Sequence, residues 1–242
     1  MKHKVAMITG AAVGIGRATA LLMAQKGAKL VLLDIDEEKL ELIKEETISM
    51  TEVITFRCDV CDEQRLRECV KDAISNFGKI DVLVNSAAIW RIRNPFVDQD
   101  MQVWRRLFEV NVTGTAVAAQ AVLPGMLEQN WGRIINVASV AGIYGNSKMT
   151  CYSATKGAVI AFTKALAKEV ADRGVTVNAV SPGTVSPSAK PDIDHVQPSD
   201  LSYMGRTGSD RENAELICFL ASEGAAYISG QNIQIDGCRK KI

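Results

Sequence analysis

The sequence predicts an α/β fold, a doubly wound parallel sheet of about seven strands with helices on both faces. Strand-like and helical segments alternate along the 242 residues, as they do where a crossover helix follows each strand. The strand-like segments are continuous apolar runs, typical of parallel strands buried on both faces. Because one α/β domain reaches roughly 200–250 residues and no linker or repeat interrupts this chain, we expect residues 1–242 to form a single domain.

The elements follow from apolar runs and the turn residues between them. The predicted strands are Val5–Thr9, Lys29–Leu33, Val53–Arg57, Asp81–Asn85, Gly132–Val137, Val175–Val180 and Asn232–Ile235. The predicted helices are Arg17–Lys26, Glu37–Glu46, Glu63–Asn76, Met101–Gln129, Cys151–Asp172 and Glu212–Ala221. Residues 184–204 form the one long irregular segment. In a compact domain such a loop is usually functional, so we expect a substrate loop or lid there.

Charge and hydropathy argue against two classes of partner. Lys and Arg balance Asp and Glu at 28 each, which leaves no overall basic field for a nucleic acid. The apolar stretches are interrupted before the ~20 residues of a membrane-spanning helix, and the first residues do not resemble a secretory signal. We therefore expect a cytoplasmic protein that binds neither membrane nor nucleic acid. The basic residues Arg239, Lys240 and Lys241 are expected to be a solvated chain end.

Metal and histidine chemistry are also disfavoured. Cys58 and Cys61 have C-x-x-C spacing, but without a second pair and with two histidines in the whole chain they make a poor zinc site. We expect reduced, structural thiols and no metal. With His3 at the terminus and His195 the other histidine, the catalytic base is expected to be a different residue type.

A glycine-rich loop, Thr9–Gly16, joins the first strand to the first helix. Its spacing is G-x-x-x-G-x-G. Glycines permit a tight turn and a close backbone approach, and the helix amino terminus then offers free N–H groups to a pyrophosphate. We therefore expect a Rossmann-like dinucleotide site. Its residues in this loop would be Gly10, Val13, Gly14, Ile15 and Gly16.

Asp34 ends the second strand, where an acid that binds the adenosine ribose is expected. Its carboxylate would accept hydrogen bonds from the ribose hydroxyls and would repel a 2′-phosphate, a like-charge contact of several kcal/mol at ~4 Å. Neither Ile35 and Asp36 nor Val13 in the glycine loop supplies a compensating cation. This pattern favours NAD over NADP. The alternative is that Asp34 only caps a turn.

Ser139, Tyr152 and Lys156 are the candidate catalytic residues. Tyr152 and Lys156 lie four residues apart on a predicted helix and so project from one face. A free tyrosine has a pKa of about 10, but a neighbouring ammonium and a positive nicotinamide ring both favour the phenolate. Tyr152 would then exchange a proton with the substrate hydroxyl, and Ser139 would hydrogen-bond the substrate oxygen.

Together these motifs resemble the short-chain dehydrogenase/reductase family over essentially the whole chain. The matching segments are Thr9–Gly16, Asp34, Asp59-Val60, Asn85-Ser86-Ala87-Ala88, Asn111-Val112-Thr113-Gly114, Ser139, Tyr152, Lys156, Pro182-Gly183-Thr184, Phe219–Ser222, Ile228–Gln231 and Asp236-Gly237-Cys238. Two of them depart from the family pattern. Ala88 and Cys238 each stand where the family has glycine. The turn beside the cofactor at Ala88 is expected to differ slightly, and the two departures are expected to affect cofactor affinity rather than proton transfer.

The resemblance implies an NAD(H)-dependent oxidoreductase that interconverts a secondary alcohol and a ketone. It adds Asn111 to the catalytic residues, as the holder of a water in a proton relay from Tyr152 through Lys156. It also implies further cofactor contacts from Ile35, Asp59, Val60, Asn85, Ala87, Tyr152, Lys156, Pro182, Gly183, Thr184 and Val185. Pairing of helices 101–129 and 151–172 between subunits would give a homotetramer or homodimer.

Substrate choice is less determined. Trp90, Ile143, Tyr144, Met149 and Met204 are candidates for an apolar pocket wall. Arg91, Arg93, Lys148, Lys190 and His195 could meet an anionic group, although we expect these charges to be mostly solvated. A cyclic alcohol, a polyol, a hydroxysteroid and a 3-oxoacyl thioester all remain possible.

Two other functional classes fit the sequence less well than a dehydrogenase does. An epimerase or dehydratase that retains bound NAD usually carries a larger C-terminal substrate domain, which we do not expect here. A catalytically silent NAD(H)-binding module is expected to have lost Ser139, Tyr152 or Lys156, and the sequence retains all three.

Overall fold

The computed structural model describes residues 1–90, 93–186 and 192–240, and in these residues seven parallel strands form one sheet. The strands are β1 (Val5–Thr9), β2 (Lys29–Asp34), β3 (Val53–Arg57), β4 (Val82–Asn85), β5 (Gly132–Val137), β6 (Val175–Pro182) and β7 (Asn232–Ile235). Their order in the sheet is β3-β2-β1-β4-β5-β6-β7. The predicted fold class, a doubly wound Rossmann-like sheet, is confirmed.

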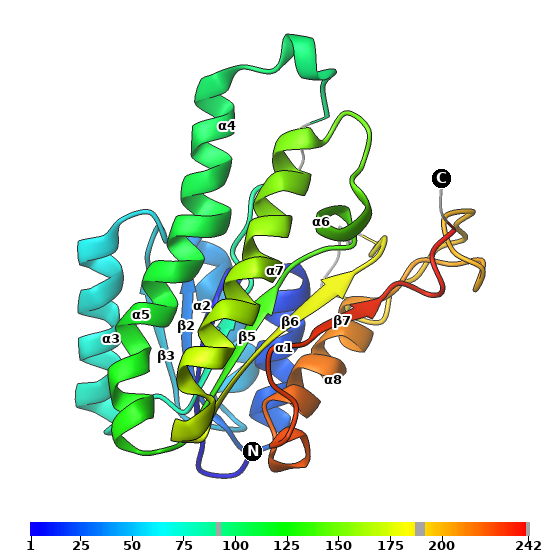
Figure 1. Cartoon of the computed structure of the whole chain (residues 1–242). Coiled ribbons are helices and arrows are strands. Elements are labelled where there is room, and N and C mark those ends of the chain that lie inside the picture. The colour runs from blue at the N-terminus through cyan, green and yellow to red at the C-terminus, as the bar shows by residue number, and fades with distance from the viewer. Residues whose placement is uncertain (91–92, 187–191, 241–242) are drawn as a thin grey trace.

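Helices cover both faces of the sheet (Figure 1). They are α1 (Gly14–Gln25), α2 (Glu37–Thr47), α3 (Glu63–Phe77), α4 (Met101–Phe108), α5 (Gly114–Glu128), α6 (Ala141–Tyr144), α7 (Thr150–Val170) and α8 (Asp210–Leu220). The apolar side chains of α1, α2 and α8 form the core on one face, and those of α3, α5 and α7 form the core on the other.

The strands are apolar throughout because their alternate side chains enter the two different cores. In β1, Ala6 and Ile8 belong to one core, and Val5 and Met7 belong to the other. All four are at most 1% exposed. This is the physical basis of the continuous apolar runs by which the strands were predicted.

The order of the strands places a crevice at the carboxyl ends of β1 and β4. The chain proceeds outward from β1 to β2 and β3, and then returns to pair β4 with the other side of β1. In open α/β sheets, ligands bind outside the carboxyl ends of the strands at such a reversal.

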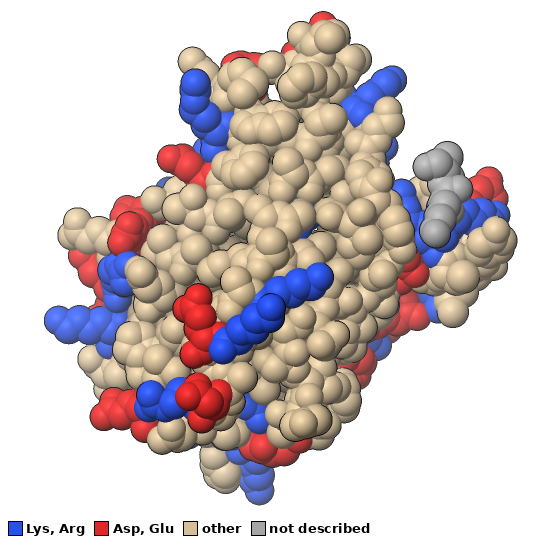
Figure 2. Space-filling view, viewed as in Figure 1, with Lys and Arg blue, Asp and Glu red and all other residues tan. Residues whose placement is uncertain are grey.

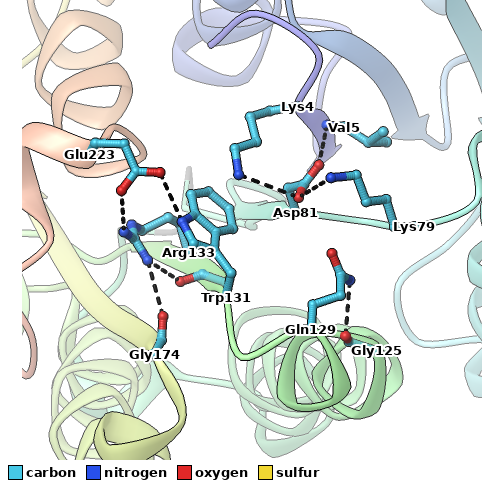
Figure 3. Close-up of polar contacts among 11 residues, drawn as sticks. Lys4, Val5, Lys79, Asp81, Gly125, Gln129, Trp131, Arg133, Gly174 and Glu223 are labelled. Atoms are coloured by element: carbon cyan, nitrogen blue, oxygen red, sulfur yellow. Dashed lines mark hydrogen bonds and ion pairs between the residues drawn. The ribbon is translucent and has the colours of Figure 1, made fainter.

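The opposite edge of the sheet is closed by ion pairs (Figure 3). Asp81, which is 1% exposed, pairs with Lys79 at 2.9 Å and with Lys4 at 3.7 Å. The Lys4 ammonium lies 3.3 Å from the ring centroid of Trp131, which the Arg133 guanidinium also faces. The charged side chains at this edge pair with one another and hold the amino ends of the strands together. The carboxyl edge is therefore the better candidate for a functional site.

The helix predicted over Met101–Gln129 is not one regular α-helix. A π-helical turn, Glu109–Thr113, separates α4 from α5. The side chain of Asn111 is held by groups outside the helix, and such turns insert an extra residue, frequently at functional sites. The combined run Met101–Glu128 also passes, by length and composition alone, as a candidate membrane span, contrary to the expectation of short apolar stretches. Its apolarity has a local cause, since Ala118, Val122 and Met126 are buried against the sheet.

Other boundaries differ by a few residues. Helix α1 begins at Gly14 rather than Arg17, because two of the loop glycines enter its first turn. Helix α8 begins at Asp210 rather than Glu212, and β6 continues to Pro182. The short helix α6 was not predicted.

Candidate active site

The glycine loop packs as its spacing requires. Gly10 has φ +66°, and a Cβ there would lie 2.7 Å from the Cα of Ala87, in the loop after β4. A Cβ on Gly16 would lie 2.1 Å from the carbonyl oxygen of Gly10. Side chains at these positions would force β1, α1 and the β4 loop apart, so the two glycines fix the shape of the crevice.

The amino end of α1 fits a dinucleotide pyrophosphate. Its N-cap residue, Val13, offers no side-chain oxygen to the first N–H groups, and the first turn contains no acidic residue. Gly14 has φ +57°, and a Cβ there would meet only Asp210 Oδ1 at 3.8 Å, so no close neighbour crowds the start of the helix. Uncapped N–H donors and the positive end of the helix dipole are the groups that bind a phosphate anion.

The Asp34 carboxylate is fixed at the end of β2 by two backbone donors. Oδ2 accepts from the Ala12 N–H at 3.0 Å, and Oδ1 accepts from the Asp36 N–H at 3.1 Å. The Asp34 carboxylate therefore also caps this turn, which was the alternative role for it. Each oxygen keeps a further lone pair for a ribose hydroxyl. The nearby Lys39 is paired with Asp36, and the Ile35 side chain is 66% exposed.

Asp59 and Val60, the residues expected to contact the cofactor, follow β3. Burial raises the pKa of Asp59, but hydrogen bonds from the Cys61 N–H and from Arg106 more than offset it, so the pKa lies below its usual range. Arg106 reaches Asp59 from α4 at 2.6 Å. Val60 is buried against Gly114. A Cβ on Gly114 would lie 2.7 Å from Cγ2 of Val60.

Ser139, Tyr152 and Lys156 come together between the end of β5 and α7. The Lys156 ammonium is buried, donates to the Val137 carbonyl at 2.7 Å and lies 5.8 Å from the ring centroid of Tyr152. The Tyr152 hydroxyl lies beside the Ser139 hydroxyl, which partly offsets the rise in the tyrosine pKa on burial, and Ser139 Oγ accepts from the Ala141 N–H at 3.1 Å. The three predicted catalytic side chains therefore form one connected group.

Burial perturbs both ionisable members of this group. It lowers the pKa of Lys156 to about 8, since a buried ammonium loses hydration. Burial raises the pKa of Tyr152, and the bond to Ser139 offsets this only in part. From the sequence we expected a lowered pKa for the Tyr152 hydroxyl. In the protein itself the pKa of Tyr152 shifts in the opposite direction, because the loss of hydration on burial outweighs the effect of Ser139.

Asn111 is fully buried in the π-helical turn and ties the site together. Its Oδ1 accepts from the Ile89 N–H at 2.8 Å, and its Nδ2 donates to the Ile89 carbonyl at 3.0 Å and to Thr155 Oγ1 at 3.1 Å. Thr155 in turn donates to the Tyr152 carbonyl at 2.8 Å. Thr155 was not predicted, because no motif marks it, yet it links Asn111 to the catalytic helix.

The segment after β6 lies on the far side of the crevice. The Gly183 N–H donates to Ile235 in β7, and the Thr184 carbonyl accepts from Gly208, both at 2.9 Å. Val185 forms an isolated parallel bridge with Gly208, and the Pro182 carbonyl accepts from Val140 at 3.1 Å. The part of the expected substrate loop at 187–191 lies outside the described residues.

The loop after β4 carries Asn85, Ala87 and Ala88. Asn85 is buried and donates to Asn136 Oδ1 at 2.9 Å, and its own Oδ1 has no partner among the described residues. Thr9 Oγ1 accepts from Ala87 at 3.4 Å. Ala88 does not have a positive φ, so its methyl group imposes no left-handed backbone strain on this turn. Cys238, by contrast, has φ +57°.

Of the five residues expected to form an apolar substrate wall, Met149 lines a cavity beside Tyr152. Met149 is 5% exposed, and the cavity is small, about 90 Å³. The other walls of this cavity come mainly from α4 and the turn before it: Asn94, Asp98, Gln99, Asp100, Val103, Trp104, Leu107 and Cys151. Those from residues 98–107 were not predicted, because they lie some 50 residues from Tyr152 in the chain.

Four other wall candidates are exposed instead: Trp90, Ile143, Tyr144 and Met204. Tyr144 donates to Gln234 in β7 at 2.6 Å. Of the five candidate cations, Arg91 and Lys190 lie outside the described residues, and Arg93, Lys148 and His195 are exposed. No group of three or more potential His, Cys, Asp or Glu metal ligands is present within the described parts of the chain.

Comparison with known proteins agrees with this geometry. Residues 10–238 match the family model described as enoyl-(acyl carrier protein) reductase. The 3-oxoacyl-[acyl-carrier-protein] reductase of Thermotoga maritima is 42% identical over 241 residues, 98% of each chain. The crystal structures of NAD+-bound xylitol dehydrogenase and of levodione reductase both superpose with a TM-score of 0.90 at 32% identity. They cover 98% of this chain and 98% and 97% of theirs, respectively. The chain belongs to the short-chain dehydrogenase/reductase family.

Proposed function

We propose that this protein interconverts a secondary alcohol and a ketone using NAD(H), with Tyr152 as the general acid and base. The observation that carries the proposal is the connected group of Ser139, Tyr152 and Lys156 beside the dinucleotide crevice. Bound NAD(H) would supply or accept the hydride.

The side chains have distinct tasks in this proposal. In reduction, Tyr152 donates its proton to the carbonyl oxygen, and in oxidation it takes the hydroxyl proton. Ser139 hydrogen-bonds the same oxygen and orients it. The carbonyl of Val137 holds Lys156, which can pass a proton between Tyr152 and the water that we assign to Asn111. The raised pKa of Tyr152 suits its acid form, and the positive charge of an oxidised nicotinamide ring favours the phenolate needed for oxidation.

The NAD preference rests on Asp34. Its fixed carboxylate would face the ribose, where a 2′-phosphate would meet a like charge. Asp34→Ser removes the charge, so we expect the NAD to NADP ratio of kcat/KM to fall by tenfold or more. An unchanged ratio would assign Asp34 to turn capping alone.

The main test follows NAD(P)H absorbance with a panel of secondary alcohols and ketones, with and without Tyr152→Phe. The panel contains cyclic alcohols, polyols, hydroxysteroids, hydroxy acids and an acetoacetyl thioester. We expect turnover with NAD(H), a loss of at least a hundredfold in kcat for the variant, and unchanged NADH binding measured by fluorescence. A variant with near-normal kcat would rule out the mechanism.

A second candidate is reduction of a 3-oxoacyl thioester. It is favoured by the relative from Thermotoga maritima, a 3-oxoacyl-[acyl-carrier-protein] reductase, and by the length of the match. The thioester member of the panel distinguishes the candidates: a kcat/KM far above that of the free alcohols and ketones would select the thioester. Turnover only with NADP(H) would contradict the Asp34 argument.

A further inference from the structure

Arg239 and Lys240 are not part of a freely solvated tail, as the sequence suggested, and Lys241 lies outside the described residues. Arg239 forms an antiparallel bridge with Ser202, and the Lys240 N–H donates to the Leu201 carbonyl at 3.0 Å. The Cys238 carbonyl accepts from the Tyr203 N–H at 3.0 Å. The residues after β7 are thereby paired with the end of the expected substrate loop.

The Arg239 guanidinium reaches the segment that leads into the catalytic helix. Its Nη2 donates to Asn146 Oδ1 at 3.0 Å. Asn146 stands between Ser139 and Tyr152 in the chain, and its backbone N–H donates to Ser153 Oγ at 3.1 Å. One side-chain contact therefore separates Arg239 from the residue next to Tyr152.

The same turn borders the proposed nicotinamide side of the crevice. A Cβ on Gly183 would lie 2.8 Å from the Cα of Asp236, so the residues before Arg239 pack directly on the segment after β6. Arg239 thus stands where three segments meet: the loop before α7, the end of the substrate loop and the C-terminal turn.

Unlike the nearby arginines Arg206 and Arg211, Arg239 contacts a neutral amide rather than a carboxylate. Arg206 is paired with Glu212 at 2.6 Å, and Arg211 is paired with Asp194 at 2.6 Å. In the described parts of the chain, no carboxylate lies within 4.0 Å of Arg239. A guanidinium has five N–H donors in a planar fork that matches a carboxylate or phosphate, and Asn146 orients this one by a single bond.

We propose that Arg239 binds an anionic group, a carboxylate or a phosphate, of a substrate whose carbonyl lies at Tyr152. The inference rests on the proposed function and narrows its substrate class to ketones and alcohols that carry such a group several bonds from the reacting carbon.

Paired substrates test it. One arm compares oxo acids of increasing length with their neutral amides, and the other compares acetoacetyl-coenzyme A with the uncharged N-acetylcysteamine thioester. In one arm at least, the wild type should prefer the charged member, and Arg239→Gln should lower kcat/KM for that member by about ten- to a hundredfold. The neutral member should be unaffected, and Arg239→Lys should retain part of the preference. The arm that responds identifies carboxylate or phosphate.

A matched control is Arg173→Gln. Arg173 also bonds an asparagine Oδ1, that of Asn130 at 3.2 Å, but it follows α7 at the opposite edge of the sheet. It should change neither member of a pair. Equal losses for charged and neutral substrates in Arg239→Gln would make Arg239 a structural clamp and overturn the inference, as would a wild type without charge preference in either arm. No turnover of any substrate would instead overturn the proposed function.

Discussion

Asp210, the first residue of α8, is buried beside the glycine loop. It is 7% exposed, and its Oδ1 would lie 3.8 Å from a Cβ on Gly14. Burial raises its pKa to about 6, and the charge of Arg17 offsets only part of this. The neighbouring Asn213 Oδ1 is also buried and has no hydrogen-bond partner within the described residues. Two buried polar groups whose lost hydration is not fully offset therefore lie near the proposed pyrophosphate site.

Asp210 should make stability depend on pH in the sense opposite to a salt-bridged carboxylate. Its pKa is higher in the folded state than its ordinary value of 3.8, so the folded state holds the proton more tightly. The free energy of unfolding then falls as pH rises from about 4 to about 6, and the cost stays in place above that. Two pKa units correspond to about 3 kcal/mol.

Asp210→Asn removes this charge. We expect it to raise the free energy of unfolding by about 2 kcal/mol at pH 8, allowing for a weaker interaction with the helix dipole, and to have little effect at pH 4. Urea unfolding at the two pH values measures this, with the exposed Asp72→Asn as control. Equal effects of Asp210→Asn at both pH values would contradict the argument.

Cys238 is a second residue with a conformational cost. Its φ of +57° lies in the left-handed region, which disfavours residues with a Cβ by roughly 1–2 kcal/mol. Its thiol is exposed. Cys238→Gly should therefore raise the unfolding free energy by about 0.5–1 kcal/mol, after the greater flexibility of glycine in the unfolded chain is counted. Cys238→Ala is the matched control, because it removes the thiol but keeps the Cβ. A gain in melting temperature with alanine as well would refute the backbone explanation.

At the scale of elements, α5 contains two glycines in contrasting surroundings. A Cβ on Gly114 would lie 2.7 Å from Val60 Cγ2, whereas one on Gly125 would meet only the Gln129 side chain at 3.9 Å. Gly114→Ala should push α5 away from the loop after β3 and cost about 1–3 kcal/mol. Gly125→Ala should stabilise the helix by about 0.5–1 kcal/mol. Thermal unfolding of the two variants compares them directly, and a loss of stability from Gly125→Ala equal to that from Gly114→Ala would show that close approach to Val60 is not the cause.

The elements themselves were predictable where local pattern and burial agree. The central strands β1, β4, β5 and β6 have mostly apolar runs because both of their faces are buried. The interruption at Glu109–Thr113 was not predictable, because it depends on bonds from Asn111 to Ile89 and Thr155, 22 and 44 residues away. Likewise, the start of α1 at Gly14 depends on the packing of the loop rather than on helix propensity.

At the scale of the whole molecule, the residues of the candidate site likewise fall into those that local sequence spacing predicts and those that only tertiary packing brings in. Ser139, Tyr152 and Lys156 were predicted from spacing within one strand–loop–helix unit, and the structure brings them together. The cavity residue Trp104 and the charged Arg239 were missed as site candidates. They reach the neighbourhood of Tyr152 only through tertiary packing, as in the bond from Arg239 to Asn146, 93 residues apart in the chain.

The assembly of subunits is a prediction at this largest scale. The face of the molecule over α5 and α7 shows few charges in Figure 2. On α7, Ala154, Ala161 and Ala165 are exposed, and their spacing places them on one stripe, where small side chains let a second helix approach closely. We propose that this face pairs between subunits.

Light scattering after size exclusion should then give a mass of two or four times the 26.2 kDa of one chain. Ala161→Arg would place an uncompensated charge in the helix contact, so it should give a smaller species while leaving the far-UV circular dichroism unchanged. Ser75→Arg, at an exposed position of α3 on another part of the surface, should leave the mass unaltered. A wild-type mass of one chain, or an Ala161→Arg variant of unchanged mass, would show that α7 does not form the contact.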